Sequence, residues 1–262
     1  MNYETILLNK AGSILHIKLN RPESLNSLSL KMAEELNQIV EEVNRDEEVK
    51  AVVLSGEGRA FCSGGDISFL QVISKMTASE VRSFVYDVQR KLGSIAYIEK
   101  PVIASIHGFA LGAGLSLALL CDIRIATENT LLGMEFIKIG IIPELGAKHF
   151  LPHLVGVGKG LELAMTGDRI NGKEAERIGL INRAVPEDQL GPVTLELAKK
   201  ISNLAPIAVQ LVKRSFKGDF LRDLDAAFEY EADLNSICYL TEDFREAAQA
   251  FMEKRKPVFK GR

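Results

Sequence analysis

The sequence predicts an α/β fold that ends in an all-helical region, and three observations support this prediction. Short apolar runs alternate with amphipathic stretches up to about residue 185, a pattern typical of layered α/β proteins. After Pro186 only helical patterns occur. The chain has 262 residues, 47% hydrophobic and 26% charged, which suits one globular domain with an appended subdomain. We therefore expect a core over residues 1–186 and a helical region over 187–262.

Within the core, each element is predicted from the period of its apolar residues. Ile- and Leu-rich runs on either side of Gly12 indicate a β-hairpin. Apolar residues then recur at helical spacing from Leu28 to Val43, and Ser27 or Ser29 is a suitable cap for that helix. The predicted strands are 5–9, 13–19, 49–54, 101–106, 122–126 and 180–185, and the predicted helices begin at Leu28 or span 81–98 and 114–121.

The C-terminal region is predicted to contain helices over 188–202, 206–216, 221–239 and 241–254. Its apolar side chains cover more than one helix face, and apolar surface of this size usually marks an interface. We therefore expect these helices to contact other subunits. The apolar residues concerned are Leu204, Ile207, Val209, Leu211 and Phe216.

Charge and cysteine usage exclude several classes of protein. There are 32 Lys and Arg against 35 Asp and Glu, a net charge of −3, which gives no general attraction to nucleic acid or acidic membranes. Cys62, Cys121 and Cys238 form no CxxC pair, so we expect neither a disulfide framework nor a metal site. The first residues lack the pattern of a signal peptide, and the longest apolar stretch, 109–121, is too short to span a bilayer. We expect a cytoplasmic protein.

Two glycine-bearing loops carry the strongest functional signal. Phe61–Ile67 and His107–Gly114 each lie at a predicted strand-to-helix junction. Glycine lets the backbone approach a ligand, and two N–H groups directed at one point would form an oxyanion hole. The alternative is that these glycines only permit tight turns. Neither GxxxxGK[ST] nor GxGxxG occurs, so a nucleotide-binding loop is not indicated.

The order and spacing of several motifs resemble the enoyl-CoA hydratase/isomerase family, the crotonase superfamily. The resemblance covers nearly the whole chain. It includes LNRP at 19–22, AFCSGGDI at 60–67, PVIA at 101–104, residues 108–114, CDIR at 121–124, GLIN at 179–182 and the tail AFMEKRKP at 250–257.

This resemblance implies a crotonase-like core of repeated ββα units, a helical region that forms trimers or dimers of trimers, and an acyl-CoA thioester substrate. No separate cofactor is implied, because coenzyme A is part of the substrate. The backbone N–H groups of Gly65 and Ala113 would hold the thioester oxygen. Substrate contacts are expected at Asn26, Ser63, Gly64, Gly65, Asp66, Ile67, Gly112, Ala113, Ser116, Phe136, Phe251 and Lys254.

The chain departs from the hydratase pattern at both acidic positions. Hydratases of the family carry one glutamate two residues after the glycine segment and another four residues before the glycine of a GxxP element. These positions are Ser116 and Phe136 here. Glu135 is adjacent to the second position, but an offset of one residue directs a side chain elsewhere. The resemblance therefore argues against an efficient hydratase.

One carboxylate remains at a position that matters in the family. Glu144 follows Pro143 directly, where some isomerases of the family carry an acidic residue that moves a proton along the acyl chain. A double-bond shift needs one such group. We expect an isomerase with Glu144 as acid and base; the alternative for Glu144 is a solvated turn residue. A decarboxylase or hydrolase of acyl thioesters, a hydratase-like enzyme, and a non-catalytic CoA-thioester-binding protein remain as alternatives.

Overall fold

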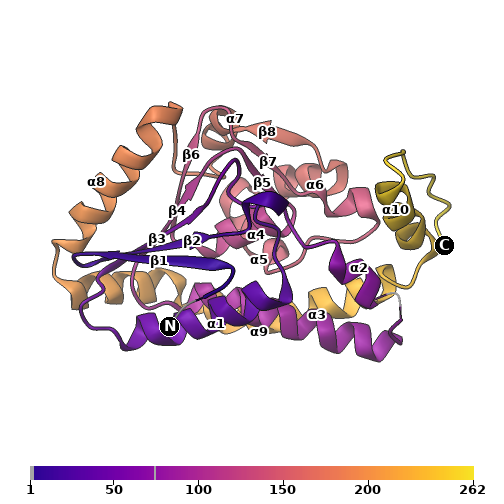
Figure 1. Ribbon diagram of the computed structural model, residues 1–262, viewed down its shortest axis with the longest axis horizontal. Coiled ribbons are helices and arrows are strands. Elements are labelled where there is room, and N and C mark those ends of the chain that lie inside the picture. Colours follow the sequence, from indigo (N-terminus) through magenta and orange to yellow (C-terminus); the bar gives the residue numbers. More distant parts are fainter. Residues whose placement is uncertain (1–2, 74) are drawn as a thin grey trace.

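The computed structural model describes residues 3–73 and 75–262, and its centre is a six-stranded sheet (Figure 1). The strand order is β1-β2-β3-β4-β6-β9; β1 and β2 form an antiparallel hairpin, and the later neighbours pair in parallel. The strands are β1 (Ile6–Ala11), β2 (Ile14–Leu19), β3 (Ala51–Gly56), β4 (Val102–Ile106), β6 (Ile123–Thr127) and β9 (Arg183–Val185).

A second sheet of three short strands was not predicted. Its order is β5-β7-β8, where β5 and β7 are parallel and β7 and β8 antiparallel. Each strand has three residues, too few for an apolar period to be visible in the sequence. The strands are β5 (Phe109–Leu111), β7 (Leu131–Gly133) and β8 (Arg169–Asn171).

Helices cover both faces of the large sheet. One face carries the main core, to which α1, α3 and α4 contribute, while Ile14, Val53 and Ile103 on the other face pack with α8. Alternate strand residues thus meet different helices, as the two-residue period of a strand requires. The helices are α1 (Leu30–Arg45), α2 (Ser68–Ile73), α3 (Ala78–Gly93), α4 (Ala113–Leu120), α5 (Ala147–Val155), α6 (Val157–Thr166), α7 (Gly172–Arg177), α8 (Leu190–Ser202), α9 (Pro206–Cys238) and α10 (Glu242–Met252), with 3₁₀ turns at Pro22–Ser24, Ser94–Tyr97, Glu135–Ile139 and Glu187–Gln189.

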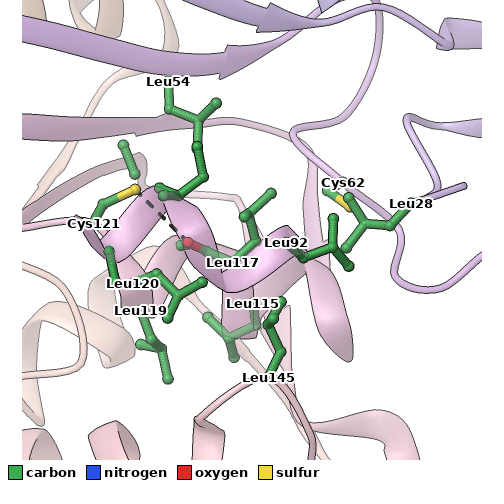
Figure 2. Packing of buried hydrophobic residues seen from close by; sticks show 14 of the residues in the cluster. Leu28, Leu54, Cys62, Leu92, Leu115, Leu117, Leu119, Leu120, Cys121 and Leu145 are labelled. Atoms are coloured by element: carbon green, nitrogen blue, oxygen red, sulfur yellow. Dashed lines mark hydrogen bonds between the residues drawn. The ribbon is translucent and has the colours of Figure 1, made fainter. Parts of the chain in front are cut away.

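Helix α4 is the most deeply buried helix of the core. Leu115, Leu117, Leu119 and Leu120 point outward around the helix and meet leucines from other elements (Figure 2). Because the helix is apolar on every side, it packs between layers rather than on the surface. Only its first residue, Ala113, is half-buried.

The cap of the first helix agrees with one of the two predicted residues. Ser29 precedes α1, and its Oγ accepts a hydrogen bond from the Met32 N–H at 3.2 Å. Ser27 is engaged elsewhere. A serine in this position supplies an acceptor to an N–H group that the helix leaves free.

Two element predictions were wrong in their extent. The helices expected at 206–216 and 221–239 are one helix, α9. Gly218 lies between them in open space, and a glycine inside a helix lowers its stability by about 1 kcal/mol. The packing of α9 on α3 outweighs this loss, so the helix continues. The strand expected at 180–185 is reduced to Arg183–Val185. Leu180 instead closes the end of α7, where its N–H donates to the Ala175 carbonyl at 2.8 Å.

After β9 ends at Val185, the remaining described elements are helical. α8 and α10 lie at opposite ends of the molecule, and α9 runs beside α3 between them (Figure 1). None of the helices in residues 3–73 and 75–262 is both long and apolar enough to cross a membrane.

Candidate active site

The two glycine loops of the sequence lie against each other in the fold. The Cys62 N–H donates to the Phe109 carbonyl at 3.0 Å, and the Leu111 N–H donates to the Cys62 carbonyl at 3.1 Å. Contact is so close at Gly114 that an added Cβ would lie 2.4 Å from the Cys62 oxygen. Only glycine permits this approach, so the second loop cannot carry a side chain at that point.

The backbone N–H groups of Gly65 and Ala113 are free in this arrangement. Within the described residues neither N–H donates a hydrogen bond: Gly65 lies between bonded neighbours, and Ala113 is the first residue of α4. A Cβ placed on Gly64 would lie 3.9 Å from the Ala113 nitrogen, which shows that the two loops adjoin at this point. Gly65 is exposed and Ala113 half-buried, so a ligand can reach both.

The helix that begins at Ala113 adds to the attraction for negative charge. The first N–H groups of a helix have no partner within it, and its N-terminus carries a partial positive charge. Gly112 precedes α4 with φ of +50°, and its N–H donates to the Gly133 carbonyl at 2.8 Å. The second sheet, through β7, therefore holds the residue before the free donor.

Hydrogen bonds to the Asp66 carboxylate fix the first glycine loop. Its carboxylate accepts from Arg21 at 2.6 Å, from Ser27 at 3.0 Å and from the Ser68 N–H at 2.9 Å. Burial acts to raise the pKa of this carboxyl, but the hydrogen bonds from Ser68, Arg21 and Ser27 outweigh it and lower the pKa to about 2. Asp66 is thus a permanently ionised support of the loop next to Gly65.

Asn26 also supports this loop. The side chain is fully buried; its oxygen accepts from the Arg21 N–H at 2.8 Å, and its amide donates to the Glu57 and Ala60 carbonyls at 2.8 and 2.7 Å. With all its polar atoms used by the backbone, the Asn26 side chain is directed into the protein and not toward a substrate. Ser63 is similar, because its hydroxyl donates to the Ser24 carbonyl at 3.1 Å.

The two positions that lack the hydratase glutamates are buried. Ser116 is 0% exposed, and Phe136 is 5% exposed with its ring 3.9 Å from where a Gly112 Cβ would lie. The neighbouring Glu135 is occupied by ion pairs with Arg169 at 2.9 Å and Lys138 at 2.5 Å. Burial acts to raise the pKa of Glu135, but the hydrogen bonds from Arg169 and Lys138 outweigh burial and lower the pKa. It is therefore held as a structural anion.

Glu144 occupies a different environment. Its Oε1 accepts from the Asn235 amide at 2.8 Å and from the Tyr239 hydroxyl at 2.9 Å, and within the described residues no cation pairs with it. Burial raises the pKa of Glu144 to about 7, against the lowering effect of the Tyr239 hydrogen bond. Its Oε2 accepts no hydrogen bond from the described side chains or backbone, and the residue is half-buried.

The segment that carries Glu144 is linked to the loop that precedes it and to the core. The Ile141 N–H donates to the Phe136 carbonyl at 3.3 Å. The Leu145 N–H donates to the buried Gln89 of α3 at 2.9 Å, and Leu145 lies next to Leu115 of α4 (Figure 2). Through Phe136 beside Gly112 and Leu145 beside Leu115, this segment borders the helix that begins at Ala113.

Three further residues predicted to contact the substrate are exposed. Ile67 is 44% exposed, and Phe251 and Lys254 are exposed at the end of α10. No bond joins Phe251 or Lys254 to the glycine loops within the described part of the chain. The same part of the chain holds no group of three or more side chains suited to a metal ion.

The residues that hold Glu144 were missed in the sequence. Glu231 and Asn235 on α9, and Tyr239 directly after its last residue, are spaced four residues apart, and all three bond to the segment 142–148. A polar residue at every fourth position of a helix predicts one polar face, but this pattern is the same for a solvent-exposed face. Only the burial of Glu231 and Asn235, both 0% exposed, distinguishes the two.

The protein thus has a layered α/β fold in which, within the described residues, two backbone N–H groups stay free where the two glycine loops meet. Comparisons specify it further. The family model for enoyl-CoA hydratase/isomerase matches residues 9–262. A crotonyl-CoA hydratase of Syntrophomonas wolfei is 39% identical over 260 residues, covering 99% of each chain. A short-chain-enoyl-CoA hydratase of Clostridium acetobutylicum is 37% identical over 257 residues, covering 98% of this chain and 97% of that one.

A solved structure agrees with these matches. The crystal structure of an enoyl-CoA hydratase from Mycobacterium avium subsp. paratuberculosis superposes with a TM-score of 0.87 at 29% identity, covering 99% of this chain and 100% of that one. The chain belongs to the enoyl-CoA hydratase/isomerase family. The predicted α/β fold with a crotonase-like core and a helical C-terminal region is confirmed.

Proposed function

We propose that this enzyme shifts the carbon–carbon double bond of an enoyl-CoA, with Glu144 as the single acid and base. The proposal is supported by two free backbone donors, Gly65 and Ala113, and by one half-buried carboxyl, Glu144, that has no cationic partner in the described chain and whose segment borders the helix that begins at Ala113. Ser116 and Phe136 leave no second carboxylate at the positions a hydratase would use.

The reaction follows from these groups. Glu144 removes a proton from C2 of a 3-enoyl thioester, and the electrons move onto the thioester oxygen, where the Gly65 and Ala113 N–H groups stabilise the dienolate. Glu144 then returns the proton at C4, which yields the 2-enoyl thioester. One such donor contributes about 3–4 kcal/mol in enzymes with comparable sites.

The environment of Glu144 suits both halves of this reaction. A group that must accept and then return a proton works best when its pKa is near the working pH. The pKa of about 7 gives comparable amounts of base and acid in the neutral range. An exposed glutamate, with its pKa near 4.3, would be a weaker base.

Hydration is the second candidate, because the two relatives described above are named as hydratases. Water addition requires that one group activate water while another delivers a proton to the carbon, or that one group do both. With a serine and a phenylalanine at the two family positions, only Glu144 remains for both tasks. Decarboxylation of a malonyl-type thioester needs the two backbone donors but no base.

One experiment distinguishes these reactions. The enzyme is incubated in D₂O with a 3-enoyl-CoA, a 2-enoyl-CoA and a malonyl-type CoA thioester in separate reactions. We expect isomerisation with deuterium uptake on the acyl chain. Predominant formation of 3-hydroxyacyl-CoA, or of CO₂, would contradict the proposal in favour of the other reactions. Binding without turnover would indicate a non-catalytic member.

The residue assignment has its own test. Glu144→Gln keeps the size of the side chain but cannot take up a proton, so we expect kcat to fall by about 10²–10⁴. Glu135→Gln is the matched control, because Glu135 is held by Arg169 and Lys138. Loss of activity in Glu135→Gln with retention in Glu144→Gln would overturn the assignment.

We also propose that the chain assembles as a trimer or a dimer of trimers through α8 and the first half of α9. Ile207 and Phe216 are 73% and 79% exposed, which is costly in water for side chains of this size. A groove of about 650 Å³ opens on the same face. It is lined by Pro101, Asp122, Ile123, Ile201, Leu204, Ala205, Ala208, Val209, Val212, Lys213, Phe216 and Lys217. A monomer in light scattering at micromolar concentration would contradict this proposal.

A further inference from the structure

One face of α9 holds the whole segment that carries Glu144. Asn235 bonds to both backbone polar groups of Ile142. Its oxygen accepts the Ile142 N–H at 3.0 Å, and its amide donates to the Ile142 carbonyl at 3.1 Å. One turn further, the Tyr239 hydroxyl reaches Glu144 itself. One turn earlier, Glu231 reaches the residues that follow Glu144.

Glu231 is the unexpected member of this set. It is 0% exposed, and its two oxygens accept the Gly146 N–H at 2.9 Å and the Lys148 N–H at 3.2 Å. These N–H groups belong to the start of α5, where the residue at the N-cap position, Gly146, has no side chain to accept them, so Glu231 accepts them from α9. Within the described residues Glu231 has no salt-bridge partner, since the ammonium of Lys148 lies 4.4 Å over the Tyr230 ring. A buried carboxyl without a partner cation is costly unless it has a role or keeps its proton.

We propose, on the basis of the isomerase mechanism above, that Glu231 is a positioning residue for Glu144. It fixes the backbone on the C-terminal side of Glu144, as Asn235 does on the other side, so that the Glu144 carboxyl has one orientation toward the acyl chain. It is also the second carboxyl at this segment, so the charge of either carboxyl disfavours ionisation of the other.

The surroundings of the two carboxyls support this coupling. Burial, and then the charge of Glu144, raises the pKa of Glu231 to about 8, and burial raises the pKa of Glu144 to about 7. The titratable and charged groups that act on the two carboxyls are Lys148 from α5, Cys238 at the end of α9 and Tyr239 directly after it. The hydrogen bonds from the Gly146 and Lys148 N–H groups, and the charge of Lys148, lower the pKa of Glu231 without outweighing burial. Two interacting carboxyls lose their protons in steps that belong to the pair.

The experiment combines carbon-13 NMR titration of glutamate-labelled enzyme with pH profiles of kcat. In the unaltered enzyme we expect two carboxyl signals that titrate between pH 6 and 9 and depend on each other. In Glu144→Gln the Glu231 titration should move below pH 8, because the neighbouring charge is gone. In Glu231→Gln a single step should remain near pH 7, kcat should fall at least tenfold, and KM should stay within twofold.

Gln89→Leu is the matched control. It removes a hydrogen bond to the same segment, at Leu145, without removing an ionisable group. We expect a lower kcat but both titration steps. If Glu231→Gln does not fold, the titration of the unaltered enzyme decides: a Glu231 signal that ionises near pH 4, or that ignores Glu144→Gln, overturns the proposal. Unaltered kcat in a folded Glu231→Gln also overturns it. Absence of isomerase activity in the unaltered enzyme would instead refute the proposed function, and the titration would still test the coupling.

Discussion

Substitution of Tyr239 by phenylalanine removes one hydrogen bond from Glu144 and little else. The hydroxyl donates to Glu144 Oε1 at 2.9 Å, whereas the ring packs edge-on against Phe244 with 4.8 Å between the centroids. A hydrogen bond to a charged group contributes about 1.5–3 kcal/mol. Since 1.36 kcal/mol corresponds to one pKa unit, Tyr239→Phe should raise the Glu144 pKa from about 7 to roughly 8–9.

The assay is the pH dependence of kcat on a 3-enoyl-CoA. The proton-accepting step needs ionised Glu144, so the acid-side inflection should move up with the pKa. At pH 7 the ionised fraction falls from about one half to about 1–10%, which predicts a five- to fiftyfold lower kcat that recovers toward pH 9. Tyr230→Phe is the control, because Tyr230 lies on the same helix with its ring under Lys148. An unmoved inflection in Tyr239→Phe would refute the role given to the hydroxyl, to Glu144, or to both.

Three further predictions follow from the loops and the buried carboxyls. Gly114→Ala should separate the two glycine loops, because its Cβ would meet the Cys62 carbonyl at 2.4 Å, and kcat should fall by roughly 10²-fold or more, while Gly158→Ala, in open space, should retain activity. Asp66→Asn should lower the free energy of unfolding by about 2 kcal/mol at pH 7. The pKa of Asp66 is lowered in the folded state, so its contribution is present above about pH 4 and lost toward pH 2; a deficit that persists at pH 2 in denaturant titrations would contradict the ion-pair explanation. Glu144 and Glu231 have raised pKa values, so their contribution to folding is largest below about pH 4.5 and is lost as the pH rises through 7 to 8. Between about pH 4.5 and 7, each group should lower the unfolding free energy by roughly 1.4 kcal/mol per pH unit. The double variant Glu144→Gln, Glu231→Gln should flatten this dependence of stability on pH, and an equally steep dependence would contradict the prediction.

The large sheet was predictable because its strands have distinct apolar runs. Residues 49–54 and 101–106 were expected as strands, and β3 and β4 occupy nearly those positions. The second sheet was not predictable, because three-residue strands such as Phe109–Leu111 have no measurable period. The break expected near Gly218 was wrong for another reason: contacts with α3 outweigh the local cost of one glycine.

For the site, the sequence indicated the donors but not their supports. The glycines around Gly65 and Ala113 are visible as a motif, and their unpaired N–H groups are what the structure adds. Glu144 was found only through its position after Pro143. The residues that surround it could not be predicted, because Asn235 and Tyr239 lie 91 and 95 residues after Glu144 in the sequence.

This separation has a consequence for how reactions diversify on the fold. The proposed oxyanion donors are backbone atoms, so a substitution of a side chain does not remove them. The proton affinity of Glu144 is instead set by burial and by the hydrogen bond from Tyr239, a residue in the last quarter of the chain. Drift in α9 can therefore retune the acid strength of an unchanged carboxyl. Two lineages with identical glycine loops can thus come to favour different proton transfers.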